Sequence, residues 1–94
     1  MPKRYADTPA ARRIDAALSN SPDPACAVAE AIGIRPNHLS MIRKGETALP
    51  ARRCGALARA LDIEPLELVS DCLKSYSDNR SWQIVALTVG LRSA

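Results

Sequence analysis

Apolar residues recur every three or four positions along most of the chain, a pattern that predicts short amphipathic helices. Five such segments fill about residues 9–76. Each starts at a proline, which suits the first helical position because an N–H has no helical partner there. The residues predicted to face inward are Ile14, Ala17 and Leu18 in the first segment, Ala25, Val28, Ala29 and Ile32 in the second, Leu39 and Ile42 in the third, Cys54, Leu57, Ala58 and Leu61 in the fourth, and Leu66, Val69, Cys72, Leu73 and Tyr76 in the fifth.

The segment 81–91 is apolar on nearly every side. Its spacing fits a helix, although its β-branched run also fits a strand, and we prefer the helix. A terminal element of this kind usually packs on something further, and a second subunit is the simplest candidate. We therefore expect residues 79–91 to be a dimerisation element, with Trp82, Val85 and Val89 at the interface.

The 94 residues suffice for a single domain, 1–94, with its core in about residues 9–76. The polar start of the chain contains no signal peptide, so we expect a cytoplasmic protein. The apolar run 84–91 is much shorter than the roughly twenty residues that cross a bilayer, and no membrane association is expected.

Catalytic and metal-binding patterns are absent from the sequence. It has one histidine, no phosphate-binding glycine motif and no metal-ligand spacing, so we expect no enzyme, no small-molecule substrate, no metal and no cofactor. Its three cysteines, Cys26, Cys54 and Cys72, fall on apolar sides of the expected helices. They are predicted to be reduced and buried.

Positive charge is concentrated in the middle of the chain. Residues 35–59 contain six basic side chains and one acidic one, whereas the whole chain has a net charge of +3. A local excess of this kind suits a surface that meets phosphates, and it also fits a solvated basic face.

Residues 25–44 have the spacing of a helix-turn-helix. The small residue Ala29 stands where two helices would touch, and Gly33 follows four positions later in the turn. Leu39 and Ile42 would hold the second helix to the first, which leaves its other side free to display Asn37, His38, Met41 and Lys44.

These residues resemble the Cro/C1 family of helix-turn-helix regulators, also called the XRE family. The resemblance rests on G-I-R-P-N-H-L-S-M-I-R-K-G at 33–45 and P-A-R-R-C-G-A-L-A-R-A-L-D-I-E-P-L-E-L at 50–68. It implies an all-α, five-helix Cro/C1-type (lambda-repressor-like) DNA-binding domain, here with an extra C-terminal element that we expect to be helical. It also implies that the third helix, about residues 36–44, enters the major groove of double-stranded DNA.

In the roles that the resemblance implies, Asn37, His38 and Met41 read bases. The sugar-phosphate backbone would be contacted by Arg35, Arg43, Lys44, Thr47, Arg52 and Arg53. Lys3 and Arg4 could act as a flexible arm along the duplex. Arg35 departs from the family, which commonly has Ser or Thr there to cap the third helix, so the footprint on DNA could differ.

Together these features predict a sequence-specific transcriptional regulator. We expect a repressor that binds a palindromic operator as a homodimer. The alternative is a protein-interaction module, an antitoxin-like or adaptor protein that uses the same fold to bind another protein.

Overall fold

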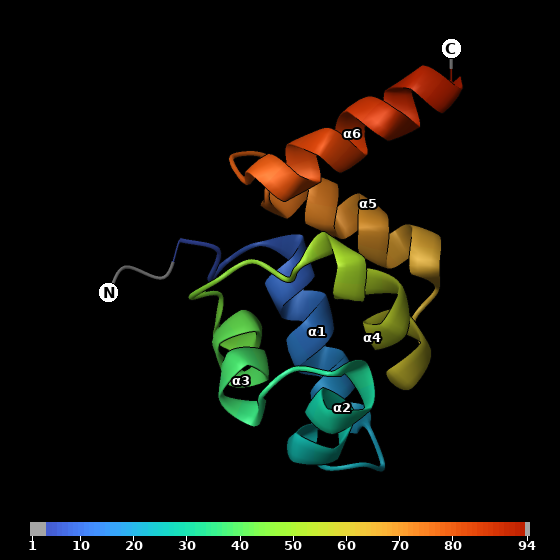
Figure 1. Cartoon of the computed structure of the whole chain (residues 1–94). Helices are drawn as coiled ribbons and strands as arrows, with labels where there is room; N and C mark the ends of the chain where they lie inside the picture. The colour runs from blue at the N-terminus through green and yellow to red at the C-terminus, as the bar shows by residue number, and fades with distance from the viewer. Residues whose placement is uncertain (1–3, 94) are drawn as a thin grey trace.

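The computed structural model describes residues 4–93, and side chains as far as residue 87. The regular secondary structure of the described chain is all helix, which confirms the all-α prediction and the choice of helix for the C-terminal segment (Figure 1). The elements are α1 (Pro9–Asn20), α2 (Ala25–Ile32), α3 (Pro36–Lys44), the 3-10 turn η1 (Ala51–Arg53), α4 (Cys54–Ala60), α5 (Pro65–Ser75) and α6 (Arg80–Ser93).

Local sequence features mark the ends of several helices. Thr8 caps α1, because its hydroxyl accepts a hydrogen bond of 3.4 Å from the backbone N–H of Ala11. Gly33 follows α2 with φ of 78°, and Gly45 follows α3 with φ of 80°. This left-handed conformation lets each helix stop within one residue. The fourth predicted helix begins as η1 directly after Pro50 and becomes α-helical at Cys54.

The five N-terminal helices enclose one hydrophobic core, in which α1 packs against α3 and α5, and α2 packs against α3 and α4. Several of the predicted inward residues are completely buried, among them Ile14, Leu39, Ile42, Leu57 and Cys72. Three others pack against that core and are partly buried: Leu61, Val69 and Leu73. Ala17 is also partly buried.

Three residues that we expected inside lie outside. Leu66 is 77% exposed, whereas Leu68 is completely buried, so the inward stripe of α5 is rotated from the predicted one. Leu66 belongs to the first turn of α5. Ala25 and Cys26 are also exposed, because they form the first turn of α2. The expectation of three buried cysteines is therefore wrong for Cys26 and right for the other two.

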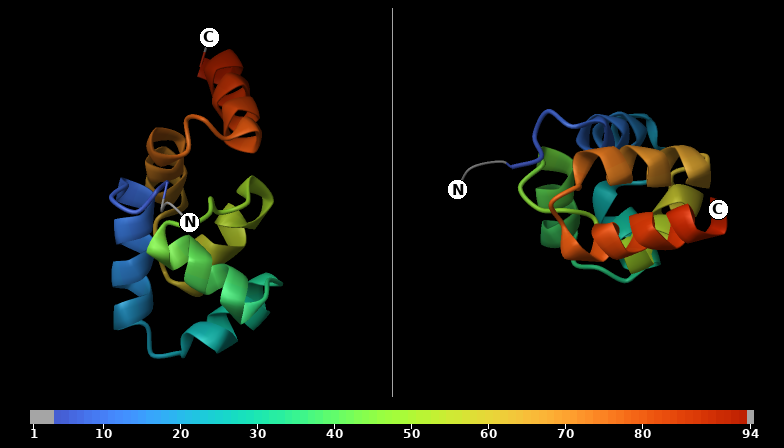
Figure 2. Two further views of the ribbon diagram at one scale, coloured as in Figure 1. Left: turned by 90° about the vertical axis from the view of Figure 1, so that its left-hand side faces the viewer. Right: turned by 90° about the horizontal axis from the view of Figure 1, so that it is seen from above.

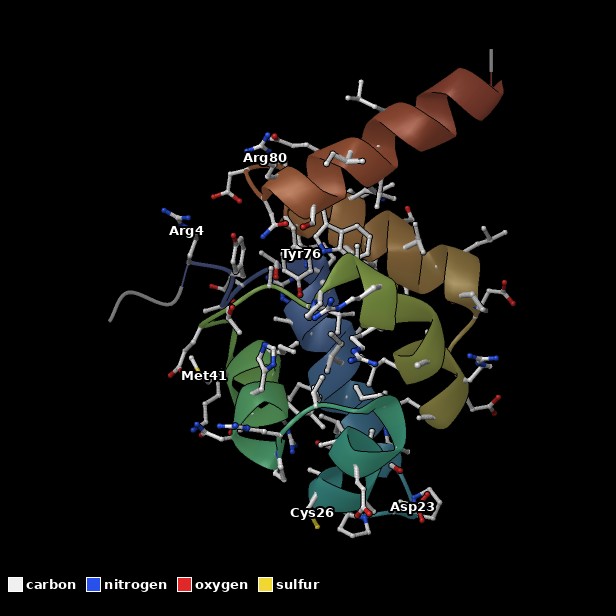
Figure 3. All side chains as sticks on the ribbon, viewed as in Figure 1. Arg4, Asp23, Cys26, Met41, Tyr76 and Arg80 are labelled. Carbon is white, nitrogen blue, oxygen red and sulfur yellow. The ribbon has the colours of Figure 1, made fainter. Side chains whose placement is uncertain are left out.

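α6 begins as part of the core. Trp82 is 2% exposed, and its indole N–H donates a 2.6 Å hydrogen bond to the backbone oxygen of Leu49, in the loop between α3 and η1. Its ring lies 5.9 Å from the ring of Tyr76, which in turn lies 4.9 Å from the ring of Tyr5. Figure 3 shows Tyr76 beneath α6. Burial is the main cause that raises the pKa of the Tyr76 hydroxyl, which keeps the hydroxyl neutral.

Hydrogen bonds and an ion pair hold the first described residues against the rest of the domain. The N–H of Tyr5 donates a 2.9 Å hydrogen bond to the carbonyl of Gly45, and its hydroxyl lies 3.1 Å from a carboxylate oxygen of Asp78. The guanidinium of Arg4 lies 3.4 Å from the other oxygen of Asp78. This placement gives no support to a free arm at Arg4; Lys3 lies outside the described residues.

None of the described helices is both long enough and apolar enough to cross a membrane. The C-terminal part of α6 extends away from the other helices, as Figure 1 and the left view of Figure 2 show.

Candidate nucleic-acid interface

The two sides of α3 differ sharply in burial. Leu39 and Ile42 are completely buried, whereas Asn37 and Lys44 are exposed and Met41 is 36% exposed. Figure 3 shows Met41 projecting away from the domain. A methionine would ordinarily be expected in a core, so its exposure here fits a helix that displays this side to a partner.

Helical geometry brings four polar or flexible side chains onto this outer side. Asn37, Ser40, Met41 and Lys44 are spaced i, i+3, i+4 and i+7, so they lie along one face of α3. Ser40 was not among the residues predicted from the sequence, although the same spacing identifies it. His38 is half-buried, one position round the helix from this face.

The start of α3 has no side-chain cap. Arg35 occupies the cap position in an extended conformation and makes no capping hydrogen bond, in accord with its departure from the family pattern. Its side chain is exposed beside the first turn of α3. The backbone N–H groups there leave a partial positive charge at the same end of the helix, which favours an anion.

Arg53 approaches the turn of the helix-turn-helix from twenty residues further along the chain. One of its terminal nitrogens, Nη1, lies 3.0 Å from the point that a Cβ on Gly33 would occupy. The absence of a side chain on Gly33 thus leaves room for the guanidinium group of Arg53. Arg52 is exposed and Thr47 is half-buried, in η1 and in the loop before it.

Arg43, by contrast, points to α1. Its Nε donates to a carboxylate oxygen of Asp15 at 2.5 Å, and its Nη2 donates to the hydroxyl of Ser19 at 2.9 Å. The structure therefore leaves the cationic groups of four residues accessible or partly accessible: Arg35, Lys44, Arg52 and Arg53. It places Arg43 in an ion pair within the domain.

The predicted interface residues of the last segment are distributed differently. Trp82 lies in the core of its own chain and Val85 is partly buried against that core. The side chain of Val89 lies outside the described residues. Trp82 thus offers a second subunit almost no surface, because its indole already packs on Tyr76 and bonds to Leu49. Among the side chains of α6 that the structure describes, the exposed large apolar ones are those of Ile84 and Leu87, at 57% and 68%.

Among residues 4–93, no three side chains of the types that bind metals come together. A helix that buries one side against a second helix across a glycine turn, and presents a polar side flanked by cations, defines the helix-turn-helix class of DNA-binding proteins.

Comparison with family models agrees with this class. Residues 27–68, from α2 to the first turn of α5, match the family model described as helix-turn-helix. This segment is similar to the helix-turn-helix of the Cro/C1-type, or XRE, family, a similarity that supports a DNA-binding helix-turn-helix regulator. Neither a curated protein nor a solved structure matches the chain.

Proposed function

We propose that this protein is a sequence-specific transcriptional repressor that binds a two-fold symmetric operator as a homodimer. In this proposal α3 of each subunit enters the major groove. The observation that supports it most strongly is the division of α3, whose inner side is completely buried at Leu39 and Ile42 while its outer side is open to solvent. The match of residues 27–68 to the helix-turn-helix family supports the same geometry.

Base recognition is assigned to Asn37, His38 and Met41. The Asn37 amide can bond N6 and N7 of adenine together, His38 can donate to a guanine acceptor, and Met41 can pack against a thymine methyl group. Phosphate contact is assigned to the accessible cations Arg35, Lys44, Arg52 and Arg53, with the hydroxyl of Thr47 beside them.

The first experiment is a selection of random duplex DNA with the purified chain near physiological salt. We expect a symmetric site, with half-sites about one helical turn apart, that binds at least about a thousandfold more tightly than a scrambled duplex. If no sequence is enriched and binding is weak and salt-sensitive, the proposal is wrong and a protein partner becomes the better explanation of this surface.

Two variants separate the assigned roles. Asn37→Ala should reduce the preference for the selected site over variants at one base pair, because an amide contact to adenine discriminates by about 1–3 kcal/mol. Arg53→Ala should weaken binding to every duplex alike and lower the slope of log affinity against log salt by about one, because one phosphate contact is lost. Equal and small effects would contradict both assignments.

The subunit interface is assigned to the outer side of α6. Ile84 and Leu87 are exposed, and the sequence continues with Leu91, so the spacing 84, 87, 91 is that of a two-helix coiled-coil seam. The side chain of Leu91 lies outside the described residues. An apolar helix face of this kind, left in water, favours packing against a second copy.

A point substitution tests the dimer better than a truncation, because removing α6 would also remove Trp82 from the core. Leu87→Glu should give a monomer in sedimentation equilibrium and should weaken binding to the symmetric site. Ser81→Glu, which adds the same charge to an exposed position of α6, is the matched control and should remain dimeric. A wild-type monomer, or a dimer that Leu87→Glu leaves intact, would refute this interface.

A further inference from the structure

The ion pair between α1 and α3 involves a residue that the sequence placed at the DNA backbone. Arg43 lies in the last turn of α3, and its Nε and Nη2 point to Asp15 Oδ1 and Ser19 Oγ at 2.5 and 2.9 Å. Asp15 and Ser19 are four residues apart on α1 and therefore lie on one face of that helix. Both acceptors thus come from the helix that packs beside α3.

The position of Arg43 round α3 explains this choice of partner. It follows the buried Ile42 and precedes the exposed Lys44, so it lies on a flank of the helix between the core and the outer face. The left view of Figure 2 shows α1 and α3 side by side. The flank with Arg43 is the one that faces α1.

We propose that Asp15 is a positioning residue for DNA recognition, an inference that rests on the proposed function. With Ser19 it holds Arg43 on α1, and Arg43 thereby fixes the orientation of α3 instead of contacting a phosphate. A phosphate contact by Arg43 would require it either to leave Asp15 or to bring the Asp15 carboxylate close to the DNA, where like charges repel.

The exposure of the Arg43–Asp15 ion pair indicates whether its loss should change folding stability or DNA binding. The side chains of Arg43 and Asp15 are 35% and 58% exposed, and ion pairs that accessible add little to folding stability. The effect is expected in the placement of α3, which governs base contacts. Loss of the pair should therefore weaken the selected site while non-specific binding changes little.

The first measurement compares two arginines by the salt dependence of binding. Arg43→Ala should weaken binding to the selected site by about two- to fivefold, because an ion pair this accessible contributes at most about 1 kcal/mol, and should leave the salt slope unchanged. Arg53→Ala is the control and should lower the slope by about one. A slope that falls equally in both variants would show that Arg43 contacts a phosphate and would overturn the inference.

The decisive variant exchanges the two charges. Asp15→Arg and Arg43→Asp should each weaken binding to the selected site, and the double variant should return to within about threefold of the wild type because the pair is re-formed in reverse. If Arg43 contacts phosphate, the double variant should bind no better than Arg43→Asp, since an aspartate would then face the DNA. Urea unfolding of each variant distinguishes weak binding from loss of the fold.

Failure of the inference and failure of the proposed function give different results. A wild-type chain that binds the selected duplex no better than a scrambled one overturns both. Selective binding by the wild type, without rescue in the charge-exchanged double variant, overturns only the positioning role of Asp15.

Discussion

Gly33→Ala should affect folding and DNA binding through two separate contacts. The residue has φ of 78°, where an L-amino acid with a Cβ is strained by about 1–2 kcal/mol. The substitution also lowers the conformational entropy of the unfolded chain, which offsets about 0.4–1 kcal/mol of this strain. The net loss of unfolding free energy is therefore about 1 kcal/mol, or a fall in Tm of roughly 4–8 °C for a domain of this size.

The second contact is with the DNA-binding surface. The new Cβ would lie 3.0 Å from Nη1 of Arg53 and 3.4 Å from its Cζ, so the guanidinium must move away. Because it is the end of a flexible side chain, this movement costs the fold little, but it removes Arg53 from its position beside the turn. Gly33→Ala should therefore weaken binding to all duplexes, by no more than Arg53→Ala does.

A double-mutant cycle distinguishes the two contacts. Urea unfolding and salt-dependent DNA titration are measured for the wild type, Gly33→Ala, Arg53→Ala and the double variant. In the Arg53→Ala background, Gly33→Ala should still cost about 1 kcal/mol of stability but should weaken DNA binding no further. Additive losses of DNA affinity would show that the displaced guanidinium is not the cause, and unchanged stability would refute the strain at residue 33.

Three further substitutions test the fold. Gly55→Ala should raise the unfolding free energy by about 0.5–1 kcal/mol in urea titration, because Gly55 is exposed in α4 and no atom lies within 4 Å of the new Cβ. Trp82→Phe should lower it by about 1–3 kcal/mol, since the Leu49 carbonyl loses its indole donor in the core; a loss below 0.5 kcal/mol would contradict that hydrogen bond's importance. Thr8→Ala should cost about 1 kcal/mol through the lost cap at the Ala11 N–H, whereas Thr8→Ser should retain most of the stability.

The helix boundaries were predictable because they depend on local chemistry. Proline and glycine act through their own backbone geometry, so Pro9 or Gly33 marks the same boundary in the sequence and in the fold. The same holds for α3, where the spacing of Leu39 and Ile42 alone distinguishes the buried side from the outer side.

The features that the sequence could not predict are contacts between distant segments. Periodicity places Leu66 and Leu68 equally well on an inward side, and only the packing of the folded chain decides that Leu68 is buried and Leu66 exposed. The ion pair of Arg43 joins α1 to α3 across 28 residues, and no local pattern distinguishes it from an arginine that contacts phosphate. A basic residue on a recognition helix is therefore a candidate for DNA contact until its partners within the domain are known.

The placement of Trp82 changes how α6 relates to the DNA-binding surface. Its hydrogen bond ends on Leu49, in the loop that leads from α3 to the exposed Arg52. The first turn of α6 therefore supports this loop from within the subunit, and Ile84 and Leu87 lie on the outer side of the same helix. If a second copy packs there, the helix that joins the subunits is also the helix that steadies the loop beside the DNA. Dimer formation and phosphate contact would then depend on one rigid element, and the spacing between the two copies of α3 would be set by α6.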